Sequence, residues 1–315
     1  MVAPVAMPSV DPRRGRHKRD DGRDRGHRGD PGAVASARPS TGAIAALAVI
    51  ALVAGTHPAH AGIDPSNLAE TAEMTFSDEF DVLDLWDGRR GTWDTTYDWS
   101  AGKNGVTLPT NDEQQWYIDA LYGPTAAVKP WSVSGGVLSL TAAPAAPAIR
   151  PLIDGHAYTS GMLTTHRSFS QRGGYFETRA RLPKGQGVWP AIWMLPADGS
   201  ALPEIDVVET VGSDPDTIYM TVHSKQNGSQ IKNGVSAKVD NVSDFHTYGV
   251  LWGDEKITFY LDGRSVGTVP SPADGKPLYI LVNLAIGGKW PGKPDATTPF
   301  PVVMQVDYVR AYTPR

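Results

Sequence analysis

The chain has 315 residues, and its 33 Gly and 26 Pro are too many helix-disfavouring residues for a helical bundle. It contains no Cys, which excludes disulfide scaffolds, thiol catalysis and Cys-ligated metal centres. The formal net charge of −5 provides no general basic surface, so we expect no nucleic-acid partner.

The first 41 residues differ in composition from the rest of the chain. They contain nine Arg or Lys and five Asp but no aromatic residue, and we expect residues 1–41 to be a disordered basic extension. This extension is long for the basic end of an export signal. A misassigned start codon, with translation beginning near Val34, is therefore a second hypothesis for this region.

Residues 42–61 have the pattern of a secretory signal peptide. Twelve consecutive apolar residues, Ala43–Ala54, precede Gly55, Pro58 and a small-x-small tripeptide that ends at Ala61. Such a run spans only about 18 Å, too short for a bilayer core of roughly 30 Å. We therefore predict cleavage after Ala61 and secretion to an extracellular or periplasmic location. Residues 62–315 carry 20 positive and 29 negative side chains, a formal charge of −9, and we expect a monomeric single domain without membrane contact.

From Thr75 onward, short segments rich in β-branched and aromatic residues are separated by Gly, Pro, Asn and Asp. The clearest hairpin joins Lys256–Leu261 to Arg264–Val269, because Asp262-Gly263 accepts the positive φ angles of a type I′ turn. Other predicted strands are residues 137–142, 158–165, 174–182, 188–195, 218–223, 246–252, 278–285 and 302–312. So many short strands predict an all-β sandwich of two packed antiparallel sheets.

Three carboxylates lie within six residues of the apolar, β-branched segment 203–210. In strict alternation Glu204 and Asp206 share one face of a strand, and Glu209 points to the other face. One residue bulged out between Val207 and Glu209 would return Glu209 to the first face. The two glutamates would then stand about 13 Å apart at their Cα atoms, and their carboxyl groups could approach to the roughly 5 Å of a retaining glycosidase. A solvated strand face with scattered acids is the alternative, which the apolar neighbours disfavour.

Two tryptophans, Trp189 and Trp193, precede this segment and share one face of a predicted strand because they are four residues apart. Trp stacks on the apolar face of a pyranose, whereas carboxylates contact its hydroxyl groups and acetal. Paired indoles beside clustered acids therefore indicate a sugar-binding cleft. Trp116, Tyr117 and Trp290 are candidates for outer subsites, and each of them could instead be a core residue.

The segment 187–196 followed by Glu204-x-Asp206-x-x-Glu209 resembles glycoside hydrolase family 16. Further matching motifs occur in the same order at residues 76–80, 158–161, 175–179, 244–248, 281–288 and 306–310. The resemblance implies a concanavalin A-like β-jelly-roll of two curved antiparallel sheets. It also implies an open cleft for endo attack on a polysaccharide, with net retention of configuration.

By the same resemblance, Glu204 is the nucleophile, Glu209 is the general acid/base and Asp206 lies between them. His223 is expected near the acid/base, with a purely structural His as the alternative. Glu204 must be ionised to attack the anomeric carbon and Glu209 must hold a proton, and two close carboxylates drive their pKa values apart. We expect no cofactor for this catalysis.

The family acts on β-1,3-glucans, mixed-linkage glucans, agar, carrageenan and bacterial exopolysaccharides. The two-residue gap before the last acid resembles the laminarinase-type branch, but Gly161-Met162 stands where typical laminarinases carry Arg, which disfavours a simple β-1,3-glucan. Residues 111–117, 161–166 and 195–200 resemble rhizobial endoglycanases that trim succinoglycan-type exopolysaccharides, and this resemblance makes Asn111 a substrate-binding candidate. The charge of −9 over residues 62–315 disfavours a sulfated substrate such as carrageenan.

Other functions are compatible with the same architecture. A non-catalytic carbohydrate-binding jelly-roll is one, although it has no need of two glutamates at retaining separation. A transglycosylase, in which a sugar hydroxyl replaces water in the second step, is another. An agarase or carrageenase of the same fold is a third.

The resemblance also suggests a structural Ca²⁺ ion. Asp307 is the expected ligand, because it lies among Val306, Tyr308 and Val309 on the last predicted strand. An unpaired carboxylate is costly to bury there, and Ca²⁺ would compensate it. A salt bridge to Arg310 or another Arg is the alternative.

Overall fold

The computed structural model describes residues 62–100 and 105–315. The expected basic extension and signal peptide, residues 1–61, lie outside the described residues. Within the two described ranges, no helix has the length and apolar character required to cross a bilayer. The helical elements there are short: α1 (Leu68–Thr71) and 3₁₀ turns at Asp98–Ser100, Pro109–Asn111, Ala126–Val128 and Arg150–Leu152.

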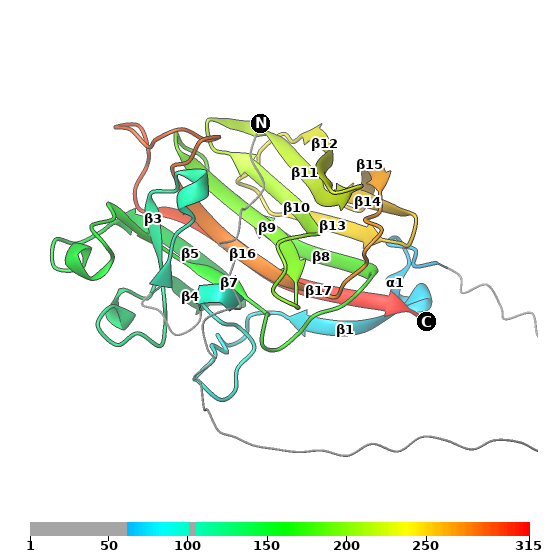
Figure 1. Cartoon of the computed structure of the whole chain (residues 1–315), viewed down its shortest axis with the longest axis horizontal. Helices are drawn as coiled ribbons and strands as arrows, with labels where there is room; N and C mark the ends of the chain where they lie inside the picture. The colour runs from blue at the N-terminus through cyan, green and yellow to red at the C-terminus, as the bar shows by residue number, and fades with distance from the viewer. Residues whose placement is uncertain (1–61, 101–104) are drawn as a thin grey trace, which may run out of the picture. The chain divides into compact units, whose positions relative to one another are not determined.

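The described strands form two β-sheets, as the sequence pattern predicts (Figure 1). The larger sheet has 11 strands, and its pairs are antiparallel except for one parallel pair, β3 and β6. Its main path runs β15 (Arg264–Pro270), β14 (Lys256–Leu261), β13 (His246–Trp252), β8 (Gly174–Arg181), β17 (Val302–Pro314), β5 (Val137–Pro144), β6 (Tyr158–Ser160), β3 (Gln115–Ile118) and β2 (Gly105–Val106). Off this path, β1 (Ala72–Asp78) pairs with β17, and β4 (Trp131–Ser134) pairs with β5.

The smaller sheet has six antiparallel strands and contains the acidic segment. In spatial order they are β12 (Ser229–Lys238), β11 (Asp214–Gln226), β10 (Glu204–Val211), β9 (Val188–Pro196), β16 (Leu278–Ile286) and β7 (Met162–Thr164). Figure 1 shows β10 between β9 and β11. Its backbone is therefore hydrogen-bonded on both sides, which fixes the positions of its side chains.

Strand alternation builds the main hydrophobic core between the two sheets. Ile192 and Met194 of β9, Ile205 of β10 and Val282 of β16 belong to this core, and each is at most 1% exposed. The alternate residues of the same strands face the other side of the smaller sheet. One surface of that sheet is thus buried by apolar contacts, and the opposite surface is free to carry polar chemistry.

A second apolar cluster covers part of that opposite surface. It joins Trp193 and Leu195 of β9 to Tyr97, Leu108 and Tyr117 from an earlier part of the chain. The segment that carries Tyr97 is attached to β7, because the backbones of Asp94 and Thr164 exchange two hydrogen bonds of 2.8 Å. This cover leaves a pocket over β9, β10, β11 and β16.

The predicted strands are found, but one of them is divided, and β1 to β4 and β12 were not predicted. The hairpin of β14 and β15 is confirmed, with φ angles of 50° at Asp262 and 73° at Gly263. The expected strand 158–165 is instead divided at Gly161, so that β6 and β7 belong to different sheets. The strand β12 was not predicted, because its polar sequence offers no apolar face to an alternation argument.

Candidate active site

An irregularity in β10 places three carboxylates on one face of the smaller sheet. Asp206 and Val208 pair with consecutive residues of β9, so Val207 has no separate partner there. On the β11 side, the register also shifts by one residue between Asp206 and Glu209. The predicted bulge is therefore confirmed. Both valines pack into the main core, while Glu204, Asp206 and Glu209 line the pocket.

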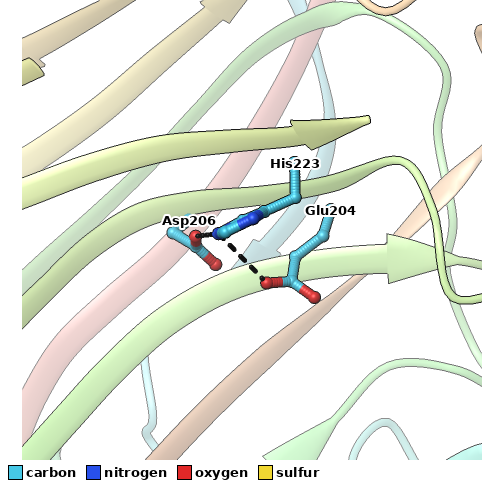
Figure 2. Close-up of side chains that lie close together, drawn as sticks. All are labelled: Glu204, Asp206 and His223. Atoms are coloured by element: carbon cyan, nitrogen blue, oxygen red, sulfur yellow. Dashed lines mark ion pairs between the residues drawn. The ribbon is translucent and has the colours of Figure 1, made fainter. Parts of the chain in front are cut away.

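Glu204 and Asp206 lie beside His223 of the neighbouring strand β11 (Figure 2). The His223 Nε2 atom is 3.3 Å from Asp206 Oδ2 and 3.7 Å from Glu204 Oε1. All three residues are at most 5% exposed, so these interactions are weakly screened by solvent. The contacts of His223 are thus with Glu204 and Asp206, whereas the family resemblance predicts it near Glu209.

Burial and mutual repulsion raise the pKa of both glutamates. For Glu209, burial followed by the charge of Asp206 raises the pKa to about 8. A hydrogen bond of 2.9 Å from Trp189 Nε1 to Glu209 Oε1 acts in the opposite direction. For Glu204, burial followed by the charges of Asp206 and Glu209 raises the pKa well above its ordinary range. The positive charge of Lys232 lowers both pKa values.

The two pKa directions fit the expected roles unequally. A raised pKa keeps Glu209 protonated near neutral pH, which suits a general acid. The same direction at Glu204 opposes the ionised form that a nucleophile needs. Because the charge of Glu209 raises the pKa of Glu204, the protonation of one glutamate depends on that of the other, and the two titrate as a group. Lys232 is the cation on the pocket wall that favours ionisation within the group.

The two predicted tryptophans share one face of β9 and line the pocket, as expected. Each is 6% exposed and uses its indole N–H within the protein. Trp189 donates to Glu209, and Trp193 Nε1 donates to Asn283 Oδ1 at 2.6 Å. Both indoles therefore orient polar groups of the pocket in addition to forming its walls.

Seven predicted site residues line this single pocket: Asn111, Trp189, Trp193, Glu204, Asp206, Glu209 and His223. Seven more lining residues were not predicted: Tyr97, Leu108, Glu113, Ala191, Lys232, Asn283 and Ala285. Asn283 could have been predicted from the sequence, because it is the one polar amide in the otherwise apolar strand β16. Tyr97 and Leu108 come from irregular segments whose position depends on long-range contacts, so no local pattern identifies them.

The other aromatic candidates do not line the pocket. Trp116 belongs to the main core and lies near His156, with ring centroids 5.2 Å apart. Tyr117 is fully buried in the second cluster. The outer-subsite prediction is wrong for these two, because β3 is covered on both faces. Trp290 is partly exposed and packs edge-on against Trp189 at 5.8 Å, so its subsite role stays a prediction.

Asp307 is not the unpaired carboxylate that the calcium hypothesis requires. Its Oδ2 atom accepts a hydrogen bond of 2.6 Å from Arg179 Nη1, and its side chain is 33% exposed. In the described part of the chain, the group of acids and His with metal-site spacing is Glu204, Asp206 and His223. Asp307 therefore does not fit a calcium ligand, and the salt-bridge alternative holds. The ion itself stays a prediction.

A model of the family described as "Glycosyl hydrolases family 16" matches residues 120–310. The chain is 50% identical over 258 residues to "Endo-1,3-1,4-beta-glycanase ExsH" of Rhizobium meliloti (strain 1021), a match that covers 82% of this chain and 54% of that protein. The chain thus spans about half the length of this relative. It is also 35% identical over 278 residues to the "Beta-glucanase" of Rhodothermus marinus, covering 80% of this chain and 88% of that protein.

A solved structure gives the same comparison at the level of the fold. The X-ray structure of the laminarinase from Rhodothermus marinus has a TM-score of 0.64 and 34% sequence identity, with 78% of this chain and 98% of that chain covered. Together with the two sheets described above, this similarity confirms the predicted β-jelly-roll.

Proposed function

The chain belongs to glycoside hydrolase family 16, and from this premise we propose that it is an endo-acting β-glycanase that retains the anomeric configuration. The observation that carries the proposal is the bulge in β10, which places Glu209 on the same face as Glu204. Without the bulge, strict alternation would place Val208 on the pocket face and Glu209 in the apolar core, so the bulge is what gives the pocket its second glutamate.

In the first step, the Glu204 carboxylate attacks the anomeric carbon while Glu209 gives its proton to the departing glycosidic oxygen. This step forms a covalent glycosyl-enzyme ester and releases the reducing-end fragment of the polymer. In the second step, Glu209 accepts a proton from water, the water oxygen attacks the anomeric carbon, and the ester bond to Glu204 breaks. Two inversions give net retention.

The neighbours of the two glutamates support this division of roles. Trp189 orients the Glu209 carboxyl through its indole N–H, which aligns the proton with the glycosidic oxygen. His223 contacts both Asp206 and Glu204. Asp206 therefore lies within a chain of polar contacts that holds the nucleophile in place.

The substrate that we propose is a β-1,3- or mixed-linkage glucan or a succinoglycan-like bacterial exopolysaccharide. The relative from Rhizobium meliloti is named as an endo-1,3-1,4-β-glycanase, which supports a β-linked polymer. Lys232 is the one Lys or Arg among the described residues that line the pocket. This is too little positive charge for a sulfated polymer, so carrageenan is disfavoured. We also propose secretion of a monomer after cleavage near Ala61, on the sequence pattern alone.

The decisive experiment compares wild type with Glu204→Gln on β-1,3-glucan, mixed-linkage glucan, agarose and succinoglycan, using reducing-sugar release and product size. Wild type should release oligosaccharides of intermediate length, and the amide variant should retain its fold but lose turnover. If both wild type and the variant bind the polymer but neither releases reducing sugar, the protein would be a non-catalytic carbohydrate-binding jelly-roll. Products longer than the substrate would indicate transglycosylation.

A further inference from the structure

Glu113 is a buried carboxylate on the pocket wall to which the double displacement assigns no role. It is 7% exposed. Its Oε1 atom accepts a hydrogen bond of 3.0 Å from Asn111 Nδ2, and its Oε2 atom accepts one of 2.6 Å from Gln115 Nε2. The hydroxyl group of Tyr117 also donates to it. The amide groups of Asn111 and Gln115 offer only N–H donors and the Tyr117 hydroxyl donates as well, so all three hydrogen bonds to Glu113 form together when it is ionised.

These hydrogen bonds continue across the floor of the pocket. The Tyr117 hydroxyl oxygen accepts from Asn283 Nδ2 at 2.9 Å, and Asn283 Oδ1 accepts from Trp193 Nε1 at 2.6 Å. An ionised Glu113 draws the Tyr117 proton toward itself, which leaves the hydroxyl oxygen free to accept from Asn283. The amide orientation of Asn283 and the ring orientation of Trp193 follow from this direction. Glu113, Asn111, Asn283 and Trp193 all line the pocket.

Resting on the glycanase function proposed above, we propose that ionised Glu113 is a positioning residue that fixes Asn111, Asn283 and Trp193 in their sugar-binding orientations. A protonated Glu113 needs an acceptor, and among these three partners only the Tyr117 hydroxyl oxygen can accept, so the hydrogen bond from Tyr117 to Glu113 is broken or reversed. Affinity for the glycan should then fall as the pH decreases through the Glu113 titration.

The surroundings of Glu113 place this titration near neutral pH. Burial, the largest cause, raises the pKa of Glu113 to about 7, and the hydrogen bonds from Asn111 and Gln115 limit the rise. Among the described residues, the titratable groups that face it are Tyr97 and Tyr117, and Glu204 lines the same pocket.

Two more charged or titratable side chains touch its segment. His156 Nδ1 lies 3.3 Å from the Gln114 carbonyl oxygen, and Lys289 Nζ donates to the Thr110 carbonyl oxygen at 2.9 Å. Both contacts are with the backbone rather than with the Glu113 carboxylate.

The test measures binding of a β-1,3-glucan oligosaccharide to Glu204→Gln protein by calorimetry between about pH 5 and pH 9. Its dissociation constant should rise by up to about tenfold per pH unit below pH 7. Adding Glu113→Gln should weaken binding about tenfold above pH 8 and remove this part of the pH dependence. Asp119→Asn is the matched control, because Asp119 is another buried acid with a raised pKa that does not line the pocket. It should bind like the parent.

Three further results complete the test. Tyr117→Phe removes the hydroxyl that links Glu113 to Asn283 but keeps the carboxylate. It should also weaken binding and flatten its pH dependence, and it replaces Glu113→Gln in the test if that variant does not fold. An unchanged pH dependence in both variants, or a lower melting temperature with unaltered affinity, would overturn the proposal. A carboxylic-acid band that titrates near pH 7 in infrared difference spectra and disappears in Glu113→Gln needs no glycan. It therefore separates a failure of this inference from a failure of the glycanase assignment.

Discussion

Removing the bulge from β10 tests whether it exists to bring Glu209 to the pocket. Because residues 207 and 208 are both Val, deleting either one gives the same protein, with Glu-x-Asp-x-Glu in place of Glu-x-Asp-x-x-Glu. Asp206 and Glu209 pair with Trp193 and Ala191, which are two residues apart on β9. After the deletion the two acids are also two residues apart, so the pairing becomes regular and the downstream register is kept. Both glutamates should still face the pocket.

The cost of the deletion is the loss of one buried valine. Val207 is 3% exposed and Val208 is 0% exposed, and both belong to the main core. Losing one such side chain should lower the free energy of unfolding by about 1.5–3 kcal/mol. This corresponds to a decrease of about 3–12 °C in the melting temperature for a chain of this size. The downstream slip of the strand that alternation alone suggests is not expected, because Thr210 keeps its partner Ile218.

The assay is reducing-sugar release by the deletion variant, with thermal unfolding as the measure of folding and Val208→Ala as the control. Residual activity with retained configuration in a folded variant is the expected result. A variant that folds well but has no activity, while Val208→Ala remains active, would refute the reasoning. It would show that the extra residue shapes the pocket itself and does more than restore the face of Glu209.

Three more predictions concern the acid cluster. Trp189→Phe removes the hydrogen bond that lowers the Glu209 pKa, so the alkaline limb of kcat/KM should move up from about 8 by up to about one pH unit. Lys232→Met should move the limbs of both Glu204 and Glu209 upward by about half a pH unit or less, because the lysine is exposed. Lys238→Met, on the same strand but outside the pocket, should shift neither. Proton NMR should show the β anomer as the first product of a β-linked glucan.

Specific outcomes would contradict these expectations. An alkaline limb that stays in place in the Trp189 variant would assign it to a group other than Glu209. Equal shifts in the two lysine variants would attribute the effect to net charge rather than to the position of Lys232. An initial α anomer would mean inversion, which is incompatible with Glu204 as a nucleophile.

The acid-bearing strand β10 could be predicted because its signal is local. Alternation of side chains is a property of a few consecutive residues, and an acid on the wrong face of an apolar strand requires a bulge. The positions of Trp189 and Trp193 follow from the same rule. The two sheets were predicted for a similar reason, since strand-forming segments and turn residues repeat along the chain. These features needed no knowledge of which segments meet in space.

The remaining pocket residues depend on contacts between distant segments. Tyr97 reaches the pocket because its segment is hydrogen-bonded to β7, and Lys232 because β12 pairs with β11. Trp116 was wrongly predicted to lie at an outer subsite. An indole is suited to stacking on a sugar, but β3 is covered on both faces, so this indole is buried. The prediction of Asp307 as a calcium ligand failed because Arg179 lies next to it on the adjacent strand, and sequence alone does not give that register.

The proton inventory of the pocket links these observations. Four buried acids line the pocket: Glu113, Glu204, Asp206 and Glu209. Lys232 and His223 line the same pocket. In the proposed mechanism Glu209 must be protonated and Glu204 ionised, and the proposed role of Glu113 also requires its ionised form, so a single pH must satisfy opposite demands. Burial raises the pKa of Glu209 to about 8 and that of Glu113 to about 7, so both titrations fall near neutral pH. On these proposals, activity should fall on the acidic side as Glu113 takes up a proton and on the alkaline side as Glu209 loses one, which gives a bell-shaped pH profile near neutral pH.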